Sequence, residues 1–183
     1  NALSAFLLLF TILFYVFVYT IWLKRKTPQN IVIGGASGAL PPVIGWAIAT
    51  NSISLESIAF FLIIFFWTPS HFWALSLYKA DDYKKAGIPM LPVTNGIQDT
   101  KKNILIYSLL MIPTIVFPYY IGFVGEVFLT LSLLLTFYYN LICFQLYNYK
   151  VGKFNIKKAR HIFSYSIIYL FLIFVFFLVD KVL

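Results

Sequence analysis

Residues 58–77 read IAFFLIIFFWTPSHFWALSL and contain no Asp, Glu, Lys or Arg. About 20 consecutive apolar residues are enough to cross a bilayer as an α-helix. Five further segments have the same length and character. The six predicted spans are Ala2–Trp22, Ile31–Ala49, Ile58–Leu77, Ile104–Val124, Val127–Tyr147 and Ile162–Val179. The fold class predicted from these runs is all-α, a polytopic transmembrane helix bundle.

Composition excludes a soluble domain. The chain has 183 residues, of which 61% are hydrophobic and 11% charged, whereas a soluble domain carries about 25% charged residues. The single cysteine, Cys143, excludes an internal disulfide and a Cys-based metal centre. No repeat or linker divides the chain, so residues 1–183 are predicted to form one transmembrane domain. The chain opens with Asn1 rather than Met, directly in an apolar segment, and we expect it to be truncated at its amino terminus.

The net charge of +8 is distributed unevenly between the connections. Of the 14 Lys and Arg residues, three lie in the first connection, five in the third and five in the fifth. Basic connections face the cytoplasm, so this asymmetry explains the charge without a nucleic-acid partner. We therefore expect no nucleic-acid binding and an integral, multi-pass protein of a bacterial inner (cytoplasmic) membrane. The mitochondrial inner membrane, with these connections facing the matrix, is the alternative.

The second span and the connection before it contain unusual residues. Gly34 and Gly38 form a G-x-x-x-G face, and the pair Pro41–Pro42 predicts a kink at membrane depth. This span either packs tightly or borders a cavity, and the double proline favours the cavity. In the preceding connection, Lys24, Arg25 and Asn30 form either a topology anchor or an anion site.

The end of the third span carries the strongest functional signal. Pro69 predicts a break in the helix, and His71 follows it at membrane depth. A histidine there is costly, so it is a functional candidate: a haem-iron ligand, or a donor to an anion or a developing charge. The long third connection, Tyr78–Asn103, is either a solvated charged loop or an ordered cap, and its apolar residues favour the cap.

Acidic and basic residues alternate at the start of that connection. Carboxylates hold a hard cation such as Mg²⁺, and lysines hold phosphate oxygens, so this pattern suits a Mg²⁺-diphosphate. The acids are Asp81 and Asp82, and the lysines are Lys79, Lys84 and Lys85. These arguments predict a membrane protein with a basic mouth and an aromatic-lined cavity.

Four strings of the sequence, in order, resemble a known family. They are YTIWLKRKTPQNIVIGG at 19–35, PPVIGW at 41–46, WTPSHFWAL at 67–75 and DYKKAGIPMLP at 82–92. They resemble the protoheme IX farnesyltransferase family, which belongs to the UbiA-type superfamily of intramembrane polyprenyltransferases. Over the last two spans the resemblance extends only to hydropathy and position.

The resemblance implies a nine-helix bundle, of which this chain would be the last six helices, around a cavity that opens to the cytoplasm. It implies transfer of a farnesyl group from farnesyl diphosphate to a vinyl group of haem B, with addition of water, to give haem O. It also implies Mg²⁺ as cofactor, and haem A synthase or oxidase assembly factors as partners. The site residues it implies are His71, Asp82 and Tyr83 as catalytic residues, Asp81 and Asp82 as metal ligands, and Lys24, Arg25, Asn30, Trp67, Trp73, Lys79, Lys84 and Lys85 as substrate-binding residues.

The chain departs from the family pattern in its acidic residues. The superfamily has two Asp-rich clusters, and the first falls in helices that this chain lacks. In the second cluster, Leu77 and Tyr78 occupy the region of the earlier acid. Outside the clusters, Ser70 stands where the family more often has proline. We therefore expect residues 1–183 alone to be inactive.

Two other functional classes remain open from the residues alone. One is a non-catalytic haem-handling protein of oxidase assembly that uses His71 as an axial ligand. The other is a small transporter with broken helices at Pro41–Pro42 and Pro69. The acidic residues of the third connection and the basic residues at the membrane surface favour the enzyme. An enzyme that uses a diphosphate needs both, whereas a haem carrier needs neither.

Overall fold

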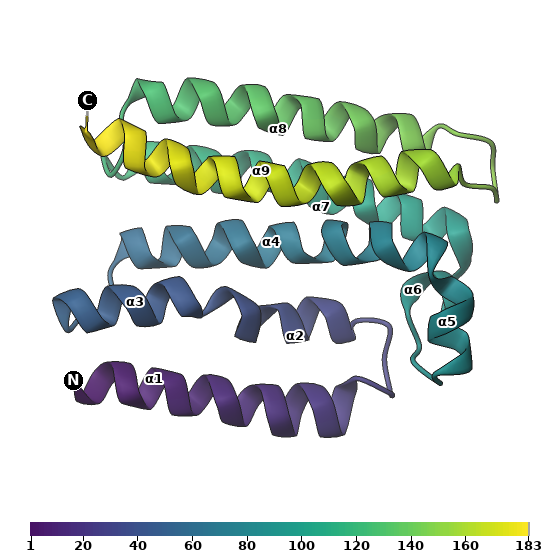
Figure 1. Cartoon of the computed structure of the whole chain (residues 1–183), viewed down its shortest axis with the longest axis horizontal. Coiled ribbons are helices and arrows are strands. Elements are labelled where there is room, and N and C mark those ends of the chain that lie inside the picture. The colour runs from purple at the N-terminus through teal and green to yellow at the C-terminus, as the bar shows by residue number, and fades with distance from the viewer. Residues whose placement is uncertain (183) are drawn as a thin grey trace.

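The computed structural model describes residues 1–182, which form helices joined by short connections (Figure 1). Leu183, the last residue of the predicted domain, lies outside the described residues. Six helical spans are long and apolar enough to cross a membrane, as predicted, and the described chain contains no strand. The elements are α1 (Ala2–Leu13), its π-helical continuation η1 (Phe14–Leu23), α2 (Asn30–Ala39), α3 (Pro41–Thr50), α4 (Leu55–Tyr78), α5 (Ala80–Lys85), α6 (Leu91–Thr94), α7 (Gly96–Tyr120), α8 (Glu126–Tyr147) and α9 (Ile156–Val182).

Prolines divide the second span, as predicted. Helix α2 ends before Leu40, and α3 begins at Pro41. Neither Pro41 nor Pro42 has an N–H to donate, and the first turn of a helix is where a missing N–H costs least. The second span therefore consists of two short helices with a junction at membrane depth.

Pro69 does not break its helix, so that expectation was wrong. It is buried inside α4, which runs without interruption from Leu55 to Tyr78. Because Pro69 has no N–H, it frees the carbonyl of Phe65, four residues earlier. A membrane helix retains an internal proline where packed neighbours and local adjustments of the backbone accommodate the freed group, and Pro69 is buried.

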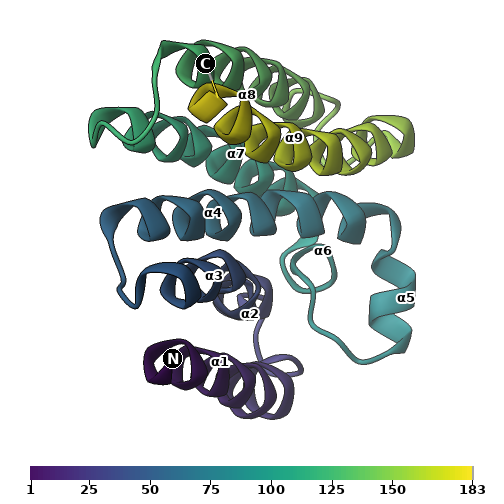
Figure 2. The same cartoon turned by 60° about the vertical axis from the view of Figure 1, so that its left-hand side comes forward.

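Helix α4 is the centre of the bundle (Figures 1 and 2). It contacts α2 and α3 as well as α7 and α9, and α8 packs between α7 and α9. The main core lies among α4, α7, α8 and α9, which we call the carboxy-terminal block, and includes the fully buried Trp73, Phe128 and Tyr169. Helices α1, η1, α2 and α3 form an amino-terminal layer, with a small cluster of Leu7, Val43 and Ala47 between α1 and α3.

The first, third and fifth connections lie at one end of the bundle, and the amino terminus lies at the other (Figure 1). This arrangement matches the predicted alternation of basic and non-basic connections. We call the end formed by residues 24–29, 79–95 and 148–155 the basic end. It holds most of the Lys and Arg residues of the chain.

The third connection is ordered, as the cap interpretation predicted. It contains α5 and α6, and Met90 and Leu91 are buried against the core. Helix α7 begins at Gly96 rather than at the predicted Ile104, because its polar first turns pack against the fifth connection. There the buried Lys101 Nζ donates to the carbonyls of Tyr149, Lys150 and Lys153.

Candidate active site

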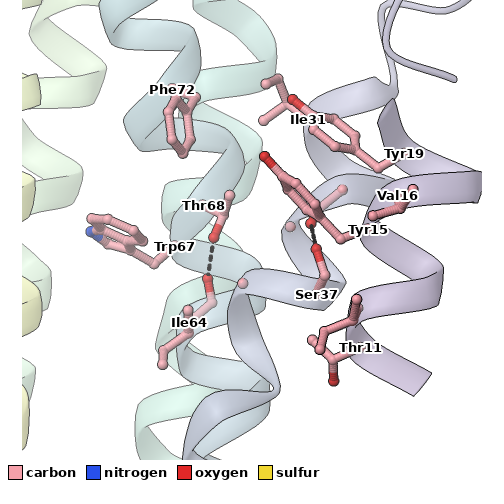
Figure 3. Close-up of a pocket in the computed structure, with 14 residues that line it drawn as sticks. Thr11, Tyr15, Val16, Tyr19, Ile31, Ser37, Ile64, Trp67, Thr68 and Phe72 are labelled. Atoms are coloured by element: carbon pink, nitrogen blue, oxygen red, sulfur yellow. Dashed lines mark hydrogen bonds between the residues drawn. The ribbon is translucent and has the colours of Figure 1, made fainter. Parts of the chain in front are cut away.

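A groove of about 490 Å³ lies between α1 and η1 on one side and α2 and α4 on the other (Figure 3). Its walls come from α1, η1, α2 and α4, and they are mostly apolar. The lining residues are Thr11, Ile12, Tyr15, Val16, Tyr19, Ile31, Gly34, Gly35, Ser37, Gly38, Ile64, Trp67, Thr68 and Phe72. Small-molecule sites in proteins have volumes of about 300–1,000 Å³, so this groove has the size of a ligand site.

The walls of the groove contain hydroxyl groups, but three of these groups already have partners. Thr11 donates to the Leu7 carbonyl at 2.7 Å. Ser37 donates to the Gly34 carbonyl at 2.7 Å, and Thr68 donates to that of Ile64 (Figure 3). Since their protons are used within their own helices, these groups add little polarity. The groove therefore suits an apolar ligand.

Two glycines let η1 and α4 approach α2 closely. A Cβ atom at Gly34 would lie 2.3 Å from Cδ2 of Tyr19, and one at Gly35 would lie 3.0 Å from Cγ2 of Thr68. At Gly38 a Cβ atom would meet nothing within 4 Å, because this residue faces the groove. The G-x-x-x-G face thus serves both predicted roles: Gly34 allows close packing and Gly38 borders the cavity.

His71 lies between α4 and α9, enclosed by aromatic rings. It stacks on Trp67 with a centroid separation of 4.3 Å and on Phe163 at 4.6 Å, and Phe72 contacts its edge. Its Nδ1 is 2.6 Å from the Ser166 hydroxyl, which donates its only proton to the Phe163 carbonyl. With the hydroxyl proton on that carbonyl, Ser166 accepts from Nδ1, and in this tautomer Nε2 is an acceptor.

The two predicted tryptophans have different surroundings. Trp67 borders the groove and extends toward α9, where its indole N–H donates to the Ser166 carbonyl at 2.8 Å (Figure 3). Ser166 thus holds both Trp67 and His71. Trp73 is completely buried against Tyr107 in the carboxy-terminal block and does not line the groove.

One end of the groove reaches the basic end. Tyr19 and Ile31 line the groove and flank the first connection, and the Lys24 ammonium lies 5.9 Å from the centroid of the Tyr19 ring. Asn30 is buried; its amide nitrogen donates to the Thr27 carbonyl, and its buried Oδ1 has no partner among the described residues. Arg25 is exposed at the same end.

The predicted acids and lysines of α5 are exposed. Lys79 and Asp82 pair with each other at 3.0 Å, and their side chains are 52% and 63% exposed. Such an exposed pair contributes about 0–1 kcal/mol to stability, so it exchanges easily for other partners. Asp81, Lys84 and Lys85 also face solvent. The structure thus brings these five charges together on a single short helix.

Tyr83 is the half-buried residue of this helix. Burial raises the pKa of Tyr83, the neighbouring Tyr78 phenol raises it further, and Lys79 lowers it. Helix α5 lies at the same end of the bundle as the first connection, which the groove reaches (Figure 1).

Several lining residues were not predicted from the sequence. Thr11, Tyr15 and Tyr19 recur every four residues along an otherwise apolar helix. That spacing places them on one face of the helix, and this polar stripe was the signal that could have identified them. Ser166 carried no such signal, because one serine in an apolar span is common.

Comparison with known families identifies the chain. Residues 1–168 match the UbiA prenyltransferase family. The chain belongs to this family. Its membership agrees with the helical bundle, the apolar groove and the charged end described above.

Individual relatives carry a more specific name. The chain is 76% identical over its whole length to a protoheme IX farnesyltransferase of Pelagibacter ubique, and covers 60% of that protein. It is 50% identical over its whole length to the enzyme of that name in Parvibaculum lavamentivorans, covering 58% of it. A third, from Azorhizobium caulinodans, is 52% identical over 95% of the chain and 57% of the relative. The chain thus spans less than two thirds of these relatives, and no solved structure matches it.

Proposed function

We propose that the protein to which this chain belongs transfers a farnesyl group from farnesyl diphosphate to a vinyl group of haem B, giving haem O. The observation that carries the proposal is the groove, which is apolar along its length and reaches a cluster of cations at one end. A prenyl diphosphate is likewise apolar along its chain and charged at one end. The names of the relatives supply the identity of the prenyl group and of the acceptor.

In this proposal the diphosphate lies at the basic end and the farnesyl chain occupies the groove. Lysines and arginines are effective partners of phosphate oxygens, and Arg25 can make a bidentate contact. The Asn30 amide nitrogen uses one proton on the Thr27 carbonyl, and its second proton would donate to a phosphate oxygen. The proposed diphosphate-binding residues are Lys24, Arg25, Asn30, Lys79, Lys84 and Lys85.

The acids of α5 fit one mode of Mg²⁺ binding. The described residues contain no group of three His, Cys, Asp or Glu side chains that would form an all-protein site. Asp81 and Asp82 are nevertheless adjacent and exposed, and Mg²⁺ is often held by one or two carboxylates together with substrate phosphates. Bound there, Mg²⁺ would neutralise negative charge that develops on the diphosphate as it leaves.

The proposed reaction balances as follows. The allylic C–O bond of farnesyl diphosphate breaks, and its electron pair leaves with diphosphate. The haem vinyl group forms a C–C bond to the farnesyl carbon, water adds its oxygen to the resulting cation, and one proton is released. Aromatic faces stabilise a nearby cation, which is the role we assign to Trp67 and Phe72. His71, through Nε2, and Tyr83 are the proposed catalytic groups.

We also propose the orientation of the chain in a bacterial inner membrane, with the basic end in the cytoplasm. A single cysteine introduced at Lys84 or Lys153 should react with a membrane-impermeant thiol reagent only from the cytoplasmic side. A cysteine at Ser54, at the opposite end, should react only from the other side. Labelling of the Lys84 position in intact cells would contradict this orientation. Haem A synthase, which would consume haem O, is the proposed functional partner.

The experiment that tests the function uses the complete protein in a bacterial strain that cannot make haem O. Extracted haems are separated by chromatography and identified by mass, with an empty vector as the negative control. We expect haem O from the native sequence, and a reduction of about ten- to a hundredfold for Asp82→Asn. Asp99→Asn, which removes an exposed acid outside α5, is the matched control and should leave the yield unchanged. The absence of haem O with the native protein would refute the proposal.

A further inference from the structure

A second cavity lies outside the groove, on the surface formed by α8 and α9 at the basic end. Its volume is about 200 Å³, and its lining residues are Ile142 and Gln145 from α8 and Lys157, Lys158 and His161 from α9. A water molecule takes up about 30 Å³ in the liquid, so the space admits a phosphate group with several waters. None of these five residues lines the groove.

The cations of this cavity have no acidic partner. Between Val127 and Val179 the sequence contains no Asp or Glu. Among residues 1–182 the ion pair between Lys79 and Asp82 is the only one. Lys157 and Lys158 therefore present two positive charges that nothing in the described chain neutralises.

The groups of the cavity that can bind an anion are side chains rather than the backbone N–H groups at the start of α9. Asn155 Oδ1 already accepts from the backbone N–H groups of Lys157 and Lys158, at 2.9 and 3.3 Å. His161 is held at its Nε2 by the Tyr138 hydroxyl, at 3.0 Å. The lysine ammonium groups are thus the strongest anion-binding groups of the cavity, and His161 lies one turn deeper along α9.

Apolar residues continue the same helix faces toward the membrane centre. Ile168 follows His161 by two turns on α9 and is 55% exposed, and Leu134 precedes Tyr138 by one turn on α8 and is 63% exposed. Cationic residues at the membrane surface thus lie above an apolar stripe. A free phosphate would use only the first of these features, whereas a phospholipid would use both.

We propose that this cavity binds the headgroup of an anionic phospholipid, with Lys157 and Lys158 on the phosphate and the acyl chains along Leu134 and Ile168. Basic pockets between transmembrane helices at the cytoplasmic surface provide the charge that such headgroups require. The site is separate from the proposed prenyl-transfer site and does not depend on it.

The test uses the complete protein purified in detergent. Binding of short-chain phosphatidylglycerol is compared with that of phosphatidylcholine and of inorganic phosphate, by native mass spectrometry and by the shift in unfolding temperature. We expect phosphatidylglycerol to bind and stabilise the native protein. The double variant Lys157→Gln/Lys158→Gln should bind it roughly 20-fold more weakly.

A matched control distinguishes the effect of the cavity on binding from the effect of the protein's net charge. Lys150→Gln/Lys153→Gln changes the charge equally in the adjacent connection but does not alter the lining of the cavity, so it should bind like the native protein. If the first variant does not fold, Gln145→Glu places a negative charge in the cavity and should weaken binding similarly. An equal loss in both double variants would show a diffuse charge effect and overturn the proposal. Equal stabilisation by inorganic phosphate or phosphatidylcholine would also overturn it.

Discussion

The carboxy-terminal block and the amino-terminal layer are built differently. In the block, four long helices bury large side chains such as Trp73, Phe128 and Tyr169 completely. In the layer, α2 and α3 are short, and the cluster that joins α3 to α1 contains only three buried residues. Large side chains of α1, such as Phe6, remain exposed to the surroundings.

This difference gives the two regions different mechanical roles: one supports the groove rigidly, and the other contains elements that can be displaced. A densely packed core resists displacement, whereas elements with few buried contacts open at low cost in free energy. The groove lies where the two regions meet. Its firm walls are α4 and α2, which pack on each other, and its loosely held walls are α1 and η1, which bury only Ser4 and Leu7. Within residues 1–182 a ligand chain would therefore enter by displacement of α1 and η1 alone, and the following predictions test this division.

The largest expected effect comes from phenylalanines in the two regions. Phe128→Ala should destabilise the protein by about 3–5 kcal/mol, because Phe128 is fully buried and a cavity would remain. Phe6→Ala removes the same atoms from a side chain that is 64% exposed and should cost close to nothing. Unfolding in detergent measures both. Equal losses would mean that the layer is packed as firmly as the block.

His71→Phe tests the junction between α4 and α9. The phenyl ring keeps the stacking on Trp67 and Phe163, and Ser166 still donates to the Phe163 carbonyl. Stability should therefore fall by only about 1 kcal/mol, the value of one hydrogen bond. Haem O formation by the complete enzyme should fall by roughly a hundredfold or more, as for a lost acid–base group. Retained activity with unchanged stability would reduce His71 to a packing residue.

Two glycines of α2 test how tightly the layer is held. Gly34→Ala should destabilise the protein by about 1–3 kcal/mol, because its Cβ would overlap the Tyr19 ring. Gly38→Ala, on the same helix, meets nothing within 4 Å and should stabilise the protein by about 0.5–1 kcal/mol, because alanine favours the helix more than glycine does. The comparison requires thermal unfolding of both variants, with Tyr19→Ala as a background that should remove the cost at Gly34. A neutral Gly34→Ala would show that η1 moves freely.

The smallest expected effect concerns Tyr83 at alkaline pH. Its pKa is raised above the ordinary value of about 10 by burial, so its contribution to stability is complete below that value. The contribution is lost as the pH rises through the pKa of the folded state, because the unfolded chain releases this proton more readily. Tyr83→Phe should therefore make the loss of stability above pH 10 slightly shallower. Identical alkaline profiles would place Tyr83 in solvent in both states.

Hydropathy predicted the six spans and the basic end because membrane helices must be apolar and their connections need not be. It failed at Gly96, where α7 begins in a polar segment that tertiary contacts of Lys101 stabilise. It also failed at Pro69, because the burial that preserves the helix there depends on the folded structure.

The site was predictable only where residue types are unusual for their depth. His71 and the charges of α5 were identified in this way, and the structure brings Trp67 and His71 into contact. Trp73 belongs to the same motif but faces the core. His71 follows Trp67 by four residues and lies on the same side of the helix, whereas Trp73 follows Trp67 by six residues and points in another direction. The hydrogen bonds through Ser166 connect segments about a hundred residues apart, which no local pattern reveals.

The one-sided basic end also has an electrical consequence. A respiring membrane is negative inside, and each unit charge moved across 100 mV changes the free energy by about 2.3 kcal/mol. In the proposed orientation the potential would act on all three basic connections in the same direction and would hold them at the negative face. Inversion of the assembled bundle would carry each of these charges through hydrocarbon against that field, so the orientation is decided once, during insertion.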